Sequence, residues 1–377
     1  MMFQRVISPG EGSSKLKGDI KITFDFFCKF KPNLFESQVN HCDIYFGNKF
    51  NMLTKFCLRK FPYPPRSLRE IYQYPVIACT FLTLLGFAFQ WWSYPVYVSF
   101  QDMNQFLEPK LELYSDGVKL CDHNLTKYLT KDRLQPIFNI TSADLYSLSL
   151  YVSKGGSWSP PDCRSKYRVN IIVPYRNRHT QLYVFLHYLH RFLMRQEIDY
   201  RIVIVEQSQE KMFNRGKLFN IGFREMEQRY PADCYVFHDV DLIPINLNNI
   251  YACSNKPRHM CSALDVFDFQ VPYQRSFGGV VALTKRQFQN VNGYSNSFFG
   301  WGGEDDEFFF RVRREYPIIR FENAVAQYIM LKHTPENRVN PLRRGRHEYS
   351  ADGLTSLNYT LLSFQLKPLC AWILVTL

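Results

Sequence analysis

An acidic cluster between aromatic residues is the stretch of this sequence best suited to chemistry. Residues 298–310 read FFGWGGEDDEFFF, so four consecutive carboxylates, Glu304 to Glu307, follow a tryptophan set among glycines. Adjacent carboxylates repel one another, and each needs a cation, a donor or water to stay ionised among apolar side chains. The glycines allow a sharp turn close to a ligand, and Trp301 offers a flat face on a hinge. A solvated acidic turn is the alternative, but the aromatic flanks favour a binding or catalytic site.

Two further motifs carry side chains that could bind a divalent cation. In HDVDLIP, Asp239 and Asp241 would point to the same side of a strand end, while Val240 points into the core. In YIMLKH, Met330 and His333 are three residues apart and could both face one metal. An imidazole and a thioether beside a carboxylate favour Mn²⁺ or another transition ion over Mg²⁺. Solvated aspartates, a buried methionine and a surface histidine fit the spacing alone equally well.

A regular alternation of apolar strands and amphipathic helices would position these motifs. Such a β-α-β-α-β pattern predicts a doubly wound α/β sheet, in which ligands bind beyond the carboxyl ends of the strands. Arg176 and Arg178 follow the first strand in PYRNRH, where guanidinium groups suit a diphosphate. The expected elements are strands over 168–175, 200–207 and 234–241 and helices over 181–194 and about 214–229.

The composition supports one large α/β domain with appendages. The chain has 377 residues, 46% of them hydrophobic, and a formal net charge of +12. Nucleic acid is a poor explanation for that charge, because residues 1–74 hold 12 Lys and Arg against 6 Asp and Glu, which is +6 of the total. This basic segment precedes an apolar one.

The apolar segment predicts a single membrane-spanning helix. Residues 71–101 are uncharged, and the 18 apolar residues from Pro75 to Trp92 would span about 27 Å. Basic residues precede the span and acidic residues follow it, which places the tail in the cytosol and the C-terminal part in the lumen. A buried core helix is the alternative. We expect a tail over 1–70, a signal anchor over 71–92, a stem over 93–120 and a luminal catalytic domain over 121–377.

Sequons and cysteines agree with a luminal domain. Three N-glycosylation sequons, at Asn124, Asn139 and Asn358, follow the predicted span. The cysteines after it form no CxxC pair, so disulfides are favoured over zinc. These cysteines are Cys121, Cys163, Cys234, Cys253, Cys261 and Cys370.

The motif set resembles the β1,4-galactosyltransferase family from about Cys121 to Tyr359. The motifs, in order, are PYRNR, FNRGKLFNIGF, FHDVDLIP, FGGVVALTK, NGYSNSFFGWGGEDDEF, MLKH and DGLTSLNY. The resemblance implies a GT-A type nucleotide-sugar-binding fold in a single-pass type II Golgi membrane enzyme. Such enzymes transfer galactose, or in some members N-acetylgalactosamine, from the UDP-sugar with Mn²⁺ and inversion at the anomeric carbon.

The resemblance also implies roles for individual residues. Asp241, Met330 and His333 would bind Mn²⁺, and Trp301 would cover the donor as its loop closes. Asp305 would be the catalytic base, deprotonating the acceptor hydroxyl as the bond to UDP breaks. The other donor-site residues would be Pro174, Arg176, Arg178, Phe213 (against uracil), Arg215, Asp239 and Val240, the acceptor-site residues Gly302, Gly303, Glu304, Asp306 and Arg343, and the disulfides Cys121 with Cys163 and Cys234 with Cys253.

Three departures from the galactose-specific pattern bear on the substrates. Ser276 precedes FGG where those enzymes carry a tyrosine that crowds the donor's C2 substituent, so we expect UDP-GalNAc to be accepted. Val266 replaces a lysine that approaches the diphosphate, which could weaken donor binding. The family's apolar pocket for the acceptor's N-acetyl group is here replaced by basic residues after Arg343; terminal GlcNAc remains the expected acceptor.

Two other functions compete with this hypothesis. The glutamate at position 307, within EDDEF, resembles the sequence pattern of the xylose-directed branch of the family, which builds glycosaminoglycan linkers. That branch, however, has an arginine in place of Gly303. A catalytically silent luminal lectin or scaffold is disfavoured, because Asp305 and His333 are both present.

Overall fold

The structure is a computed structural model that describes residues 78–86, 95–99, 102–107, 119–123, 136–208, 211–333 and 351–377. The expected tail over 1–70, Asn124 and Arg343 lie outside these ranges, as does much of the expected span over 71–92. Residues 78–86 form a helix. Within the described residues, no helix combines the length and apolar character that a membrane crossing needs.

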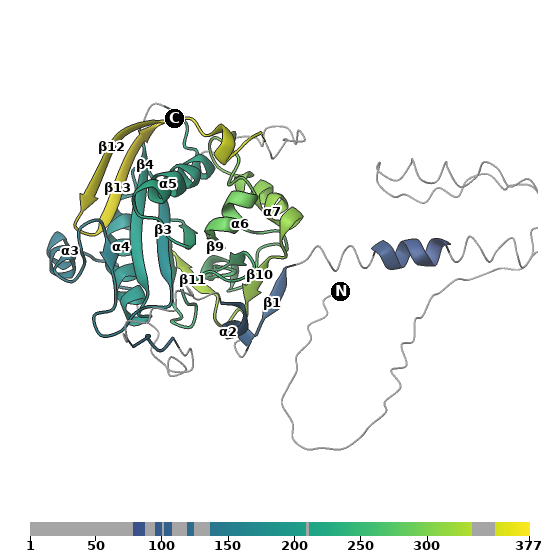
Figure 1. Cartoon of the computed structure of the whole chain (residues 1–377), viewed down its shortest axis with the longest axis horizontal. Helices are drawn as coiled ribbons and strands as arrows, with labels where there is room; N and C mark the ends of the chain where they lie inside the picture. Colours follow the sequence, from purple (N-terminus) through teal and green to yellow (C-terminus); the bar gives the residue numbers. More distant parts are fainter. Residues whose placement is uncertain are drawn as a thin grey trace, which may run out of the picture. The chain divides into compact units, whose positions relative to one another are not determined.

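Three parallel strands form the centre of the sheet, as the sequence predicts. β3 (Arg168–Tyr175) pairs in parallel with β4 (Asp199–Gln207) on one side and β5 (Cys234–His238) on the other. α4 (His179–Arg195) and α5 (Arg215–Arg229) connect them (Figure 1). Because β4 and β5 flank β3, a doubly wound sheet has its ligand crevice at the carboxyl end of β3.

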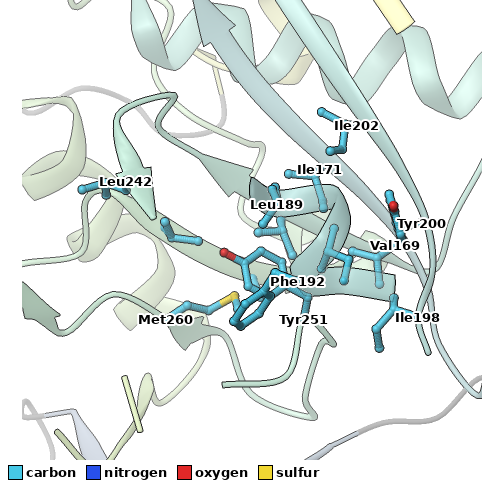
Figure 2. Packing of buried hydrophobic residues seen from close by; sticks show 14 of the residues in the cluster. Val169, Ile171, Leu189, Phe192, Ile198, Tyr200, Ile202, Leu242, Tyr251 and Met260 are labelled. Carbon is cyan, nitrogen blue, oxygen red and sulfur yellow. The ribbon is translucent and has the colours of Figure 1, made fainter. Parts of the chain in front are cut away.

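The two faces of the sheet bury different helices. Val169 and Ile171 of β3 share an apolar cluster with α4, whereas Ile172 belongs to a second cluster with α5. This alternation is why the strand reads as a continuous apolar run. Figure 2 shows the α4-side cluster, to which Leu242 and Tyr251 belong together with the sheet residues Val169 and Ile171. The chain that follows β5 is thereby anchored to the core.

Further strands extend the sheet on both sides into a mixed one. Its order is β1-β10-β7-β9-β5-β3-β4-β13-β12, with β2 paired to β4, and β9 runs antiparallel to β5. A small second sheet has the order β6-β11-β8. The bounds are β1 Val96–Val98, β2 Ser157–Trp158, β6 Leu242–Pro244, β7 Arg258–His259, β8 Ala263–Leu264, β9 Val280–Thr284, β10 Ile319–Phe321, β11 Gln327–Met330, β12 Thr360–Lys367 and β13 Cys370–Thr376.

The remaining described helices are short, apart from α7. Their bounds are α2 Met103–Phe106, α3 Ser142–Ser149, α6 Lys285–Asn290 and α7 Glu304–Glu315, with 3₁₀ turns η3 Asp265–Phe267 and η4 Leu354–Ser356. α7 begins at the acidic cluster, where carboxylates are favoured by the helix dipole.

The third strand is shorter than expected. It ends at His238, and residues 239–241 form a turn in which the amide of Leu242 donates to the carbonyl of Asp239 over 3.3 Å. The turn lets the chain leave β5 and start β6 beside β11. Asp239 and Asp241 therefore lie on a turn rather than on a strand, although Val240 is buried as predicted.

Part of the expected stem belongs to the folded domain. β1 pairs in parallel with β10 at the edge of the sheet, and Met103 of α2 is fully buried. The cysteines pair as the resemblance implies, Cys121 with Cys163 and Cys234 with Cys253. Cys261 and Cys370 are buried free thiols.

Candidate active site

The small sheet brings the expected metal ligands together. β6 starts directly after Asp241, β11 ends at Met330, and the two strands pair with Leu242 opposite Met330. The amide of Leu331 donates to the carbonyl of Asp241 over 2.7 Å. Nδ1 of His333 lies 3.0 Å from Oδ2 of Asp241. The carboxylate of Asp241 and the imidazole of His333 thus lie together, and Met330 is the last residue of the strand beside them. A carboxylate, an imidazole and a thioether form a donor set that fits Mn²⁺ or another transition ion.

The diphosphate end of the expected donor site adjoins these ligands. The hydrogen bond that His333 donates to the Asp241 carboxylate raises the pKa of His333, while burial and the positive charge of Arg178 oppose this rise. Arg178 is the N-cap residue of α4. Nε2 of Gln181, in the first turn of α4, donates to the carbonyl of Lys332 over 2.7 Å. The carboxyl end of β3 and the expected metal ligands are therefore neighbours.

Arg215 joins two of the expected site carboxylates. Its Nε donates to Oδ1 of Asp239 over 2.6 Å, and its Nη1 lies 3.4 Å from Oε1 of Glu304. Burial raises the pKa of Asp239 to about 6 and that of Glu304 to about 7, against the opposing charge of Arg215. Burial alone would lower the pKa of Arg215, but the two carboxylates hold it above its usual value. Arg215 therefore stays protonated although it is buried, and its positive charge partly offsets the effect of burial on the two carboxylates.

Asp305 lies over a glycine turn. Asp305 is the second residue of α7, two positions after the N-cap Gly303, whose φ of 96° lies in the left-handed region that favours glycine. Its Oδ1 accepts from the amide of Asp306 over 2.9 Å. A Cβ added to Gly278 would lie 2.7 Å from Oδ2 of Asp305. The expected base thus occupies space that only a glycine leaves open.

Tyr273 lies beside two of the expected site carboxylates, and the motif analysis did not single it out. Burial raises its pKa, and the negative charges of Asp305 and Asp306 raise it further. Its hydroxyl also hydrogen-bonds to Asp306. An aromatic residue three positions before Ser276, in PYQRS, was the available signal.

Glu307 differs from its acidic neighbours because it forms a structural ion pair with a buried arginine of the same helix. Its Oε1 accepts from Nη2 and Nε of Arg311 over 2.8 and 3.1 Å. Arg311 is buried and also donates to the carbonyls of Gly293 and Asp352. The expectation that each carboxylate needs a cation or donor therefore holds for Glu307. The contact with Arg311 accounts for this glutamate without a sugar acceptor.

Phe213 and the Trp301 loop are joined at the expected uracil site. The guanidinium carbon of Arg176 lies 5.2 Å from the centroid of the Phe213 ring, and Nη1 of Arg176 donates to the carbonyl of Lys211. The amide of Gly300 donates to the carbonyl of Phe213 over 2.7 Å. Trp301 is 54% exposed beside this bond. A loop attached in this way can cover a bound ligand with a large apolar face.

The other expected residues divide between buried and exposed positions. Pro174 is buried at the end of β3, and Ser276 is buried as well. Gly302 has a φ of 102°, with open space where a Cβ would be. Val266 is exposed in η3, next to Asp265, whose carboxylate accepts from the amide of Met330. The sequon residues Asn139 and Asn358 are both exposed.

The central sheet, the turn after β5 and the acidic start of α7 lie within the segments that two glycosyltransferase family models match. Residues 121–254 match the family described as the N-terminal region of glycosyl transferase group 7, and residues 258–334 match the N-terminal domain of galactosyltransferase. The chain belongs to the β1,4-galactosyltransferase family, as its motifs indicate.

Individual relatives show the extent of the similarity. Beta-1,4-galactosyltransferase 1 of Bos taurus is 44% identical over 226 residues, which cover 58% of this chain and 56% of that protein. Beta-1,4-galactosyltransferase 4 of Rattus norvegicus is 38% identical over 245 residues, covering 63% and 71%. The chain thus spans little more than half the length of the first of these relatives. A crystal structure of the Drosophila β1,4-galactosyltransferase 7 catalytic domain with xylobiose is 26% identical, with a TM-score of 0.47, and covers 56% of this chain and 93% of that one.

Proposed function

We propose that this chain is an inverting, UDP-sugar-dependent glycosyltransferase. It moves galactose or N-acetylgalactosamine in β1,4 linkage to terminal GlcNAc of a glycoprotein or glycolipid glycan, and Ser276 favours N-acetylgalactosamine. The observation that carries the proposal is that the Asp305 carboxylate lies beside Gly278, two residues from Ser276, so closely that a Cβ at position 278 would lie 2.7 Å from Oδ2. Transfer with inversion needs a general base close to the donor sugar, and the Asp305 carboxylate lies beside the expected donor site.

The proposed roles follow from the chemistry of each group. Asp305 takes the proton of the acceptor hydroxyl, while Arg176 and Arg178 bind the diphosphate. Trp301 covers the donor and excludes water, which would otherwise compete as acceptor. Asp241, Met330 and His333 are the residues that would hold Mn²⁺, which supplies positive charge to the departing diphosphate.

The remaining donor and acceptor contacts are part of the same proposal. Tyr273 is added to them on the strength of its contact with Asp306. The proposed donor residues are Pro174, Phe213, Arg215, Asp239, Val240 and Ser276, and the proposed acceptor residues are Gly302, Gly303, Glu304, Asp306 and Arg343.

We propose the type II Golgi topology for the same chain. The uncharged run over 71–101, with basic residues before it, supports one membrane helix and a luminal domain. The two disulfides support an oxidising compartment. Protease protection of the C-terminal part in sealed Golgi vesicles would test this orientation.

The direct test of function is sugar transfer by the full chain in detergent with Mn²⁺. UDP-Gal and UDP-GalNAc are offered in parallel, each with a GlcNAc-terminated acceptor and with a xylose acceptor, and Asp305→Asn is the control. Faster transfer from UDP-GalNAc, lost in the control, supports Ser276 as the donor gate. Faster transfer from UDP-Gal removes the GalNAc preference. Transfer to xylose alone replaces the acceptor assignment with the glycosaminoglycan linker, and no transfer with any pair refutes the proposal.

A further inference from the structure

Arg320 is a buried cation that is held by backbone carbonyls. It lies on β10 and is fully buried. Its Nη2 donates to the carbonyl of Ser276 over 2.6 Å and to the carbonyl of Gln274 over 3.1 Å. No carboxylate of the described residues forms an ion pair with it. A buried charge is costly unless it is fully hydrogen-bonded, so these carbonyls are essential to its placement.

His259 connects Arg320 to a third backbone carbonyl, that of Gly278, through two hydrogen bonds. Nε of Arg320 donates to Nδ1 of His259 over 3.1 Å. Because arginine only donates, Nδ1 must accept, so the proton is on Nε2. That Nε2 lies 3.1 Å from the carbonyl of Gly278 and donates to it. Burial and the charge of Arg320 lower the pKa of His259, which keeps the ring neutral.

The three carbonyls belong to alternate residues of one segment. Residues 274, 276 and 278 lead into the turn at Gly278 and Gly279, so one guanidinium–imidazole pair fixes the path of the backbone there. The Cys261 thiol donates to the same Gly278 carbonyl over 3.2 Å. This path sets where Ser276 lies and how close Gly278 comes to Asp305.

We propose that Arg320 and His259 are positioning residues that set the donor gate and the base. Neither touches the substrates; they act through the backbone of residues 274–278. The inference rests on the proposed function, in which Ser276 faces the donor's C2 substituent and Asp305 accepts the proton. The hydrogen bonds of Arg320 and His259 explain why Ser276 keeps one position relative to the expected donor site.

The edge strand β1 completes the environment of Arg320. The Tyr97 hydroxyl accepts from Nη1 of Arg320 over 3.3 Å, and the guanidinium carbon lies 5.8 Å from the centroid of the Tyr97 ring. The guanidinium therefore has an acceptor for each of its three nitrogens. An ammonium cannot reproduce this planar fork, so lysine is not a conservative replacement.

The first test compares Arg320→Lys with Arg258→Lys. Arg258 is equally buried, on the neighbouring strand β7, but it donates to the carbonyl of Ile250 and not to residues 274–278. For Arg320→Lys we expect kcat to fall by about tenfold to 100-fold, because a displacement near 1 Å at a reacting group can cost that much. The ratio of UDP-Gal to UDP-GalNAc turnover also shifts. Arg258→Lys lowers the melting temperature and leaves the ratio unchanged.

The second test exchanges His259 for two residues of different hydrogen-bonding capacity. His259→Gln keeps one acceptor and one donor and should retain the donor ratio and most of kcat. His259→Leu has neither and should behave as Arg320→Lys. A purely structural role would make both variants lose stability without separating them in kcat or donor ratio.

Hydrogen exchange at residues 274–279 gives a readout that needs no turnover. We expect faster exchange there in Arg320→Lys and His259→Leu, and not in Arg258→Lys or His259→Gln. Unchanged exchange, or a kcat within about twofold of that of Arg258→Lys, overturns the positioning role. Absence of transfer by the wild-type chain would instead refute the proposed function, and the exchange data would still decide the positioning role.

Discussion

Nδ1 of His333 lies 3.0 Å from Oδ2 of Asp241, where β6 and β11 meet. The hydrogen bond from His333 to the Asp241 carboxylate raises the pKa of His333, so without a cation the imidazole keeps its proton to a higher pH than usual. A metal ion that binds both residues must displace that proton. Metal affinity and pH are therefore linked at this pair.

We predict that Mn²⁺ affinity rises with pH through the pKa of His333. Electron paramagnetic resonance titrations between about pH 6 and pH 8 should show tighter binding at the alkaline end. Asp241→Asn should weaken binding by at least about tenfold. His187→Ala, on α4, is the matched histidine control and should bind as the wild type does. Equal affinity at both ends of the range would exclude His333 as a ligand.

Arg215 neutralises two buried carboxylates, so its loss should be severe. Arg215→Met leaves Asp239 and Glu304 without their shared cation, and we expect the free energy of unfolding to drop by about 3–5 kcal/mol. Arg314→Met removes an exposed arginine of α7 and should change it by less than about 1 kcal/mol. Chemical denaturation of both variants measures the difference. Similar values for the two would show that the Arg215 cluster contributes little.

Glu304 should make the folded state less stable at alkaline pH. Burial raises its pKa from 4.5 to about 7, against the opposing charge of Arg215. The folded protein holds this proton more tightly than the unfolded chain does. The free energy of unfolding is therefore highest below pH 4.5 and decreases as the pH rises through 7. Glu304→Gln should therefore exceed the wild type by up to about 3 kcal/mol at pH 8, and the two should converge near pH 4.5. A constant difference across this range would contradict the raised pKa.

The long elements of the fold were predictable because their patterns are strong. β3, β4, α4 and α5 each carry eight or more residues of a consistent apolar pattern, and none of their ends lies more than two residues from the expected one. β10 and β1 have three residues each, too few for a periodic signal. Their place in the sheet depends on partners far away in the sequence.

The sequence predicts which motifs form the candidate site, but it does not predict all of the side-chain contacts that connect them. The bond of Asp241 to His333 agrees with the ligand set that the family resemblance implies. The pair of Glu307 with Arg311 spans four residues of α7, so its spacing was a local signal that the motif analysis did not use. Nothing in the local sequence showed that Arg320 binds the carbonyl of Ser276, because that contact depends on tertiary packing.

His190 should make the protein sensitive to acid. It is fully buried between the Tyr200 hydroxyl and the carbonyl of Leu369, and burial lowers its pKa from 6.5 to about 4. The unfolded chain binds the proton first, so stability falls as the pH drops from 6.5 towards 4, by up to about 3 kcal/mol. His190→Gln should lack this slope. Because Glu304 acts in the opposite direction, each variant is compared with the wild type at every pH.

Gly278 offers the sharpest test of Asp305 as the base. Its Cα–H faces Oδ2 of Asp305, and a Cβ would lie 2.7 Å from that oxygen, so Gly278→Ala must displace the carboxylate. The backbone of Gly278 is outside the left-handed region, so the alanine adds no backbone strain. We expect kcat to fall by about 100-fold while the melting temperature changes little, since the displaced side chain is partly exposed.

The double variant Gly278→Ala with Asp305→Asn decides how Gly278→Ala acts. If alanine acts only by moving the base, it should reduce the residual rate of Asp305→Asn by far less than it reduces the wild-type rate, because groups that act as a unit are not additive. Equal reductions in both backgrounds would show that Gly278 affects transfer by a route other than Asp305. The comparison needs only initial rates with one donor at saturation, and circular dichroism confirms that each variant is folded.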